Sequence, residues 1–222
     1  MLYNKLYGLE LLDRAVKGID GVSVLPYRVY RSPQDFKRSH WTGANRVLIR
    51  SNLNGDMSSH HWAMLPRKDV FVRVKSAVKQ MFKEGRAAFP DRDDFHLILH
   101  RVKPRRSYNL SIGLFHDELG LTVKFNGGSF RTKVWRMEMP IHVDFSNLAK
   151  NLQRRGFTEN QARVIQARLT RAYGAIIREF KRRGMKTKEI KFETSVTTRK
   201  SDPTRLEFYD LLVGSVPKPQ QS

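Results

Sequence analysis

The chain lacks cysteine altogether over its 222 residues. Disulfide bonds, thiol nucleophiles and thiolate zinc sites are therefore excluded, and the composition suits a reducing compartment such as the cytoplasm. Long hydrophobic runs are lacking as well, since no stretch approaches the roughly 18 apolar residues that a transmembrane helix needs. The apolar pattern of residues 2–17 is interrupted by charged residues, so this segment is neither a signal peptide nor a membrane span.

Acidic residues are scarce relative to basic ones. The sequence holds 42 Lys and Arg against 21 Asp and Glu, which gives a formal net charge of +21. The excess positive charges of such a chain repel one another, and binding to a polyanion neutralises them. Nucleic acid is therefore the expected partner, ahead of an anionic membrane surface.

Recognisable catalytic and cofactor motifs are also lacking. The sequence contains neither a Walker loop nor a dinucleotide-binding fingerprint. His96 and His100 would lie roughly 13 Å apart on a strand that rises about 3.3 Å per residue, so we do not expect them to share a metal ion. The nearest match to a nuclease signature is Pro90-Asp91 with Glu189-Ile190-Lys191, whose two parts are far apart in the chain. We expect no catalytic residue, no metal and no cofactor.

Hydrophobic spacing defines the first half of the chain. Apolar residues recur at helical intervals over residues 2–17 and 69–88. They alternate as in strands over 22–31 and 45–52, and a short third strand over 62–65 is a further prediction. Arg46 and Arg50 fall on one face of the strand 45–52, so that face is expected to be basic.

The second half begins with what the sequence predicts as a four-stranded antiparallel platform, residues 95–139. Its turns include Pro104-Arg105-Arg106 and Asn126-Gly127-Gly128, the clearest hairpin signal of the chain. A short helix from residue 144 and a long helix opened by the capping box Thr158 to Gln161 follow. A strand over 188–196 and a strand or short helix over 205–216 come last.

The sequence therefore predicts an α+β fold of antiparallel sheets packed with helices. We expect a single domain over residues 1–216, made of two halves of strands followed by a helix, about 1–90 and 91–216. The remaining residues, 217–222, are predicted to be a disordered tail.

Basic and aromatic side chains share the expected platform, which is typical of surfaces that bind nucleic acid through phosphate contacts and base stacking. Alternation puts Tyr108, Leu110 and Ile112 on a core face, whereas Arg131, Lys133 and Trp135 share the other face. The alternative is that the aromatics only form core and the charges are solvated. The candidate nucleic-acid-binding residues are Arg38, Trp41, Arg46, Arg50, Arg101, Lys103, Arg105, Arg106, Lys124, Arg131, Lys133 and Trp135.

Part of this region resembles a known family. Val102-Lys103-Pro104, Tyr108-Asn109-Leu110-Ser111-Ile112 and the passage from Pro140 to Phe145 are similar to the second half of whirly-type proteins. The resemblance covers mainly residues 95–150, and it implies two four-stranded sheets with helices that bind single-stranded nucleic acid. Whirly-like folds also occur in early RNA-binding proteins of nucleus-forming jumbo phages, which implies the cytoplasm of a host cell.

We therefore expect a non-enzymatic protein that binds single-stranded RNA, in preference to DNA, with low sequence specificity. The alternatives are a single-stranded DNA-binding protein, a metal-dependent nuclease and a structural adaptor on an anionic surface. Homo-oligomerisation stays open.

Overall fold

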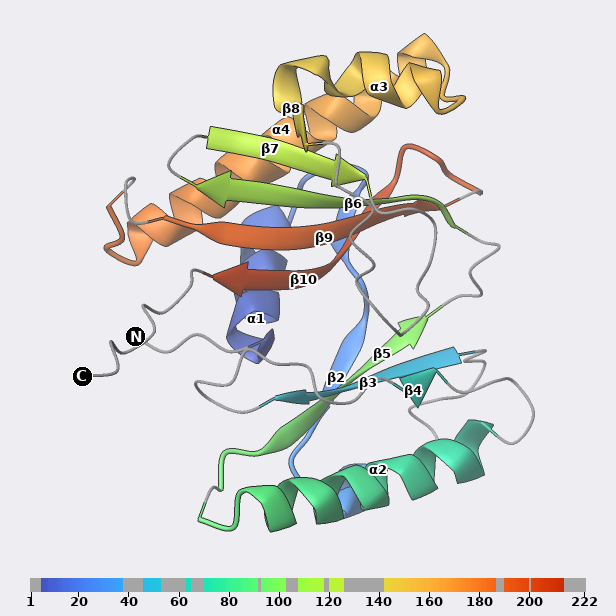
Figure 1. Ribbon diagram of the computed structural model, residues 1–222, viewed down its shortest axis with the longest axis vertical. Coiled ribbons are helices and arrows are strands. Elements are labelled where there is room, and N and C mark those ends of the chain that lie inside the picture. Colours follow the sequence, from blue (N-terminus) through green and yellow to red (C-terminus); the bar gives the residue numbers. More distant parts are fainter. Residues whose placement is uncertain are drawn as a thin grey trace. The chain divides into compact units, whose positions relative to one another are not determined.

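The computed structural model describes residues 5–37, 46–52, 63–64, 70–91, 93–102, 108–117, 120–125, 142–186, 190–199 and 201–213 (Figure 1). The chain divides into two compact units. The first unit comprises Met1–Leu6 and Leu25–Pro104, and the second comprises Tyr7–Val24 and Arg105–Ser222. None of the described helices is both long and apolar enough to cross a membrane.

The first unit is a four-stranded antiparallel sheet with one long helix on one of its faces (Figure 1). The strand order is β2-β5-β3-β4. The elements are β2 (Tyr27–Tyr30), the short 3-10 helix η1 (Pro33–Asp35), β3 (Arg46–Asn52), β4 (Ala63–Met64), α2 (Val70–Ala88) and β5 (His96–Val102).

Helix α2 forms because its apolar residues recur at helical spacing and can all face the sheet. Val74, Val78, Met81 and Phe82 are buried in one cluster with the sheet residues Tyr30, Val47, Ile49, Leu97 and Leu99, together with Phe36 and Phe95. The rings of Phe82 and Phe95 meet edge to face, with centroids 5.8 Å apart. The helix passes close to Phe95 at Gly85, where an added Cβ would lie 2.3 Å from the ring.

The second unit is built on a six-stranded sheet of order β1-β10-β9-β6-β7-β8. Its neighbouring strands are antiparallel except for β1 and β10, which are parallel. Helix α1 (Lys5–Val16) begins in the first unit and continues into the second. The other elements are β1 (Val22–Val24), β6 (Tyr108–Asp117), β7 (Gly120–Phe125), β8 (His142–Asp144), the 3-10 helix η4 (Phe145–Asn147), α3 (Leu148–Arg154), α4 (Glu159–Arg182), β9 (Phe192–Arg199) and β10 (Leu206–Val213).

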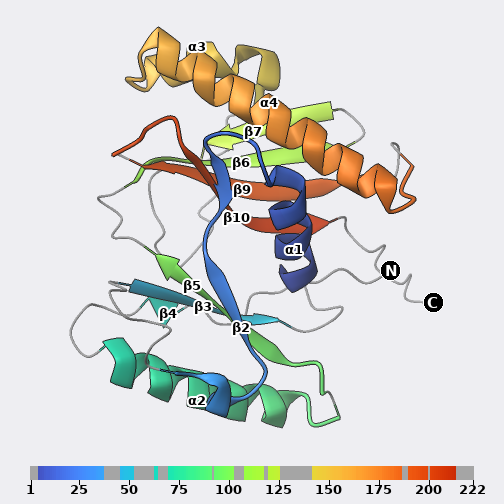
Figure 2. The ribbon, with the colours of Figure 1, turned by 180° about the vertical axis from the view of Figure 1, so that it is seen from behind.

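Helices α4 and α1 lie across one face of this sheet, in front of it in Figure 2. Helix α4 begins with the predicted capping box: the Thr158 hydroxyl accepts from the Gln161 amide N–H, and the Gln161 side chain accepts from the Thr158 amide N–H. The buried stripe of α4 is Ala162, Ile165, Leu169, Ala172, Ala175, Ile176 and Phe180. Helix α1 approaches the sheet at Gly8, where an added Cβ would lie 2.1 Å from the Leu211 carbonyl oxygen.

Two strand predictions need correction. The segment 22–31 is not one strand, because it is divided at Leu25-Pro26 into β1 and β2, which belong to different sheets. The expected platform over residues 95–139 is not one sheet either. Strand β5 pairs with β2 and β3 in the first sheet, whereas β6 and β7 pair with each other in the second. The fourth strand of the expected platform lies outside the described residues.

Both errors have the same physical reason. The alternation of apolar and polar residues indicates which residues form a strand and which face each side chain takes, but it does not indicate which strands are neighbours in a sheet. The sequence predicts a hairpin turn at Pro104, but the strands on its two sides, β5 and β6, are not partners. The α+β class is confirmed, while the whirly-like arrangement of the sheets is wrong.

Candidate functional site

The sheet of the first unit has two chemically different faces. Val47 and Ile49 of β3 point into the core with α2, so alternation turns Leu48, Arg50 and Asn52 to the opposite face. Register then adds residues from the neighbouring strands: His100 lies opposite both Leu48 and Tyr27, and His96 lies opposite Asn52. We call this surface the Arg50 face, with the residues Tyr27, Leu48, Arg50, Asn52, His96 and His100.

One end of the Arg50 face is held by a chain of hydrogen bonds. His96 Nδ1 lies 2.8 Å from the Asp94 carbonyl oxygen, so this nitrogen carries the proton and donates it. The Asn52 amide group then donates to His96 Nε2 over 2.8 Å, and its oxygen accepts from the Leu6 N–H over 3.0 Å. The neighbouring Ser51 carbonyl accepts from Lys5 Nζ. His96 is therefore fixed as a neutral ring with both nitrogens engaged.

Arg50 lies in the middle of this face, and only 1% of its surface is exposed. Arginine is almost never buried so completely, because removing its charge from water costs several kcal/mol that other interactions must offset. The sequence predicts a basic face at Arg46 and Arg50, and in the structure the Arg50 side chain of that face is buried. A guanidinium buried this completely keeps its charge only where neighbouring groups compensate it.

His100 is fully buried, and neither of its ring nitrogens has a hydrogen-bond partner among the described residues. Burial, and secondly the positive charge of Arg50, lower the pKa of His100 from 6.5 to about 3. The Leu25 backbone acts in the opposite direction but does not reach the geometry of a hydrogen bond. His100 is therefore neutral at physiological pH.

The sheet of the second unit also has a polar face, opposite the one covered by α4 and α1. Register and alternation put Glu193, Glu207 and Asp210 on it. Glu207 is 2% exposed and forms a two-pronged ion pair with Arg199, in which Arg199 Nε lies 2.6 Å from Glu207 Oε2. We call this surface the acidic face. Within the described part of the chain, no three acidic or histidine side chains gather closely enough to hold a metal ion by themselves.

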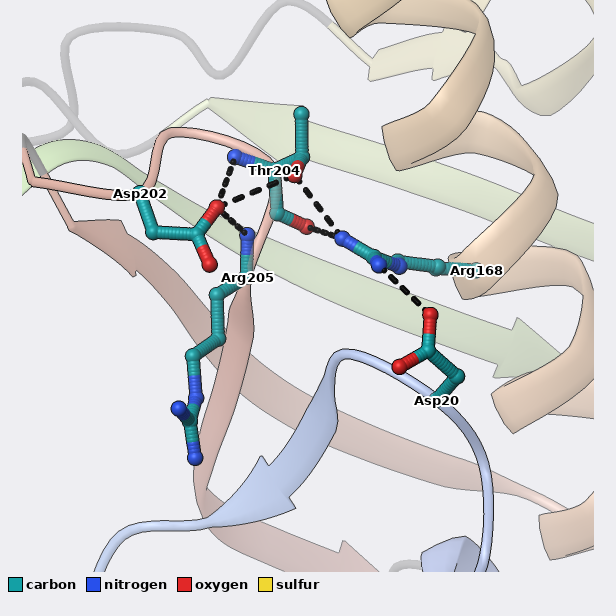
Figure 3. Close-up of polar contacts among 5 residues, drawn as sticks. All are labelled: Asp20, Arg168, Asp202, Thr204 and Arg205. Atoms are coloured by element: carbon teal, nitrogen blue, oxygen red, sulfur yellow. Dashed lines mark hydrogen bonds and ion pairs between the residues drawn. The ribbon is translucent and has the colours of Figure 1, made fainter.

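A separate polar cluster in the second unit joins three segments (Figure 3). Arg168 of α4 donates over 2.8 Å to both the carbonyl and the hydroxyl of Thr204, in the turn between β9 and β10, and over 2.9 Å to Asp20 before β1. The Asp202 carboxylate accepts from the Thr204 hydroxyl and from the backbone of Thr204 and Arg205. These hydrogen bonds join α4, the turn between β9 and β10 and the segment before β1, so we interpret the cluster as a structural clamp.

Few of the nucleic-acid-binding residues predicted from the sequence have a side chain that the structure describes. Arg50 is the one candidate whose side chain is described. Arg46, Arg101 and Lys124 lie on β3, β5 and β7, but their side chains are not among those described. The remaining candidates, Arg38, Trp41, Lys103, Arg105, Arg106, Arg131, Lys133 and Trp135, lie outside the described residues.

Sequence reasoning missed His100, Asn52 and the carboxylates of the acidic face. His100 was considered only as a metal ligand paired with His96. Its proximity to Arg50 depends on the pairing of β3 with β5, which are separated by the whole of α2. The signal that could have found them is a polar residue directly after a core residue on each strand, Arg50 after Ile49 and His100 after Leu99.

No protein-family model and no curated protein sequence matches this chain. Solved structures do match. The D-cycloserine synthetase DcsG has a TM-score of 0.57 at 13% identity, over 91% of this chain and 59% of that one. The dinucleotide-forming acetyl-coenzyme A synthetase 1 of Ca. Korarchaeum cryptofilum has a TM-score of 0.57 at 15% identity, over 95% and 92%. An L-amino acid ligase of Bacillus licheniformis has a TM-score of 0.52 at 9% identity, over 92% and 42%.

This likeness overturns the whirly-type resemblance and the expectation of a non-enzymatic nucleic-acid-binding protein. The physical reason is that net charge is summed over the whole surface and does not identify a site, and short strand motifs recur in unrelated sheets. The chain spans little more than half of DcsG and less than half of the L-amino acid ligase. At these identities the likeness establishes the fold alone, which this chain shares with two synthetases and a ligase.

Proposed function

We propose that the chain is an ATP-dependent ligase, an enzyme that couples the formation of a bond to the cleavage of ATP. The observation that carries this proposal is the fold likeness to two synthetases and a ligase over 91% to 95% of the chain. One of these synthetases was solved with coenzyme A and Ca-AMPCP, a nucleotide analogue with its calcium ion. Because such an enzyme works where ATP is abundant, we propose a cytoplasmic location.

The first test is nucleotide binding by calorimetry, with MgATP and MgADP and with a chelator control. We expect saturable binding of both nucleotides, and we expect it to weaken when the chelator removes magnesium. Folding of the protein is checked by circular dichroism.

The second test is turnover. Radiolabelled ATP and magnesium are incubated with the protein and pools of carboxylic acids, amines and thiols, and ADP or AMP release is followed. We expect nucleotide cleavage that depends on an acceptor pool. A folded wild-type chain that fails to bind either nucleotide at millimolar concentration would disprove the proposed function.

A further inference from the structure

Helix α2 carries a row of cations on its surface. Lys79, Lys83 and Arg86 are exposed and occupy positions i, i+4 and i+7 of the helix. With about 3.6 residues per turn and a rise of about 1.5 Å per residue, they share an arc of about 60° and span about 10 Å along the helix axis. We call these three residues the α2 row. Lys75 lies one turn before it on the same side of the helix.

Within the described part of the chain, no acidic side chain forms an ion pair with the α2 row. Glu84 is the acidic residue of α2, but it lies about 100° or more around the helix from each cation of the row and accepts from Gln80 over 2.8 Å. Exposed arginines of other helices have a glutamate about one turn before them: Glu10 for Arg14, Glu159 for Arg163 and Glu179 for Arg182. The α2 row is therefore a patch of exposed positive charge that its own helix does not compensate.

This alignment of cations destabilises the helix. Like charges at i, i+3 and i, i+4 repel each other, and the row contains one pair of each kind, Lys83 with Arg86 and Lys79 with Lys83. Arg86 lies in the last turn, where a cation interacts favourably with the helix dipole, but Lys79 lies in the middle of the helix and has no such interaction. Solvation of the helix surface does not require cations in one line, so we look for the reason in an anionic partner.

The chemistry around the row favours carboxylates over nucleic acid and over lipid. Binding of single-stranded nucleic acid uses aromatic rings for base stacking, whereas Phe82, the aromatic side chain of α2 that is described, is buried in the core. A helix that lies on a membrane inserts its apolar face, but the apolar face of α2 packs against the sheet, and Val72 is its exposed large apolar residue among those described. Carboxylates require only charge at a suitable spacing, which lysines provide.

We propose that the α2 row is a docking surface for an acidic segment of a partner protein. A helical segment with carboxylates at i, i+4 and i+7 presents them at the same spacing as the three cations. Each contact is an exposed ion pair, so the binding is weak and sensitive to salt. The inference goes beyond the proposed function and does not depend on it, because neither nucleotide binding nor ligation enters it.

The experiment is fluorescence anisotropy of the full chain with a labelled peptide made of three repeats of Glu-Ala-Ala-Ala-Glu-Ala-Ala, at about 0.05 M NaCl. We expect saturable binding by wild type. We expect the combined variant Lys79→Gln, Lys83→Gln, Arg86→Gln to bind about tenfold more weakly, which is the effect that three exposed ion pairs can supply. Glutamine preserves helix propensity, and circular dichroism checks that the variant folds.

The matched control is the combined variant Lys17→Gln, Arg154→Gln, Arg178→Gln. It removes the same charge from exposed positions that are dispersed over the second unit. We expect it to change the affinity for the peptide less than about twofold, because salt screens charges that lie far from the docked peptide. An equal loss of affinity in both combined variants would show that net charge alone attracts the peptide, and it would overturn the proposal.

Two further probes separate the classes of partner: a single-stranded oligouridine, and vesicles that contain phosphatidylserine. We expect the two combined variants to bind each of these probes with equal affinity. If loss of the α2 row weakens binding of either probe more than binding of the peptide, the row is a surface for nucleic acid or for lipid, and the proposal is overturned. A folded wild-type chain that does not bind the peptide overturns it as well.

Discussion

At the scale of a single residue, His100 makes the stability of the fold depend on pH. Its pKa is about 3 in the folded chain and 6.5 in the unfolded chain, so the unfolded chain binds the proton more readily. The contribution of His100 to stability is complete above pH 6.5 and is lost as the pH falls from 6.5 towards 3. Between pH 7.5 and pH 5 the loss is about 2 kcal/mol.

Urea unfolding at pH 7.5 and pH 5 measures this loss. We expect His100→Leu to remove most of it, because leucine fills the buried position without a titrating group. The other strongly shifted group, Glu179, has a pKa lowered from 4.5 to about 2, mainly by its hydrogen bond to Arg182, so its contribution is lost only below about pH 4.5. If His100→Leu loses as much stability as wild type between pH 7.5 and pH 5, another titrating group is responsible for the loss.

At the scale of the element, two helical glycines have opposite surroundings. An added Cβ at Gly85 of α2 would lie 2.3 Å from the ring of Phe95, in the packed core of the first unit. At Gly174 of α4 the nearest atom is Arg178 Nη1 at 3.5 Å, at the end of a flexible side chain. The same substitution therefore has two different physical consequences.

We expect Gly174→Ala to stabilise the chain by about 0.5–1 kcal/mol, because alanine restricts the unfolded chain and favours the helix. We expect Gly85→Ala to destabilise it by about 1–2 kcal/mol, because the clash with Phe95 exceeds the same gain. Denaturant midpoints of the two variants and wild type measure both effects. Stabilisation by both substitutions would mean that Phe95 can move away from α2.

The elements themselves were largely predictable because their signals are local. The spacing of Val74, Val78 and Phe82 defines α2, and the capping box at Thr158 places the start of α4 to the residue. The division of 22–31 at Pro26 was not predicted, because a proline in a strand indicates an edge or a bulge and does not reveal that the chain changes sheets.

At the scale of the whole molecule, the sequence was least informative about the site. The sequence identifies Arg50 as a candidate, but its burial and its proximity to His100 depend on which strands are neighbours. The carboxylates Glu207 and Asp210 come together with Glu193 on one face only through the pairing of β9 and β10 and the register shift in β10. Net charge suggests a polyanionic partner, but it is summed over the whole surface and does not identify a site.

The net charge of +21 still has a consequence for the folded chain as a whole. In several described ion pairs both side chains are exposed to solvent, as in Arg163 with Glu159 and Arg14 with Glu10. Exposed ion pairs of this kind contribute little to the free energy of unfolding, so their screening by salt destabilises the fold only slightly. The repulsion among the excess cations is long-ranged, and salt reduces it because the Debye length falls below about 10 Å above 0.1 M.

We therefore expect the melting temperature to rise when NaCl is increased from about 0.05 M to about 0.3 M, because screening of repulsion outweighs screening of the exposed pairs. A net gain of about 1 kcal/mol corresponds to about 2–4 °C for a chain of this length. Differential scanning fluorimetry measures the shift, and KF in place of NaCl distinguishes screening from chloride binding, since screening depends on ionic strength alone. A melting temperature that falls with either salt would show that attractive ion pairs outweigh the repulsion.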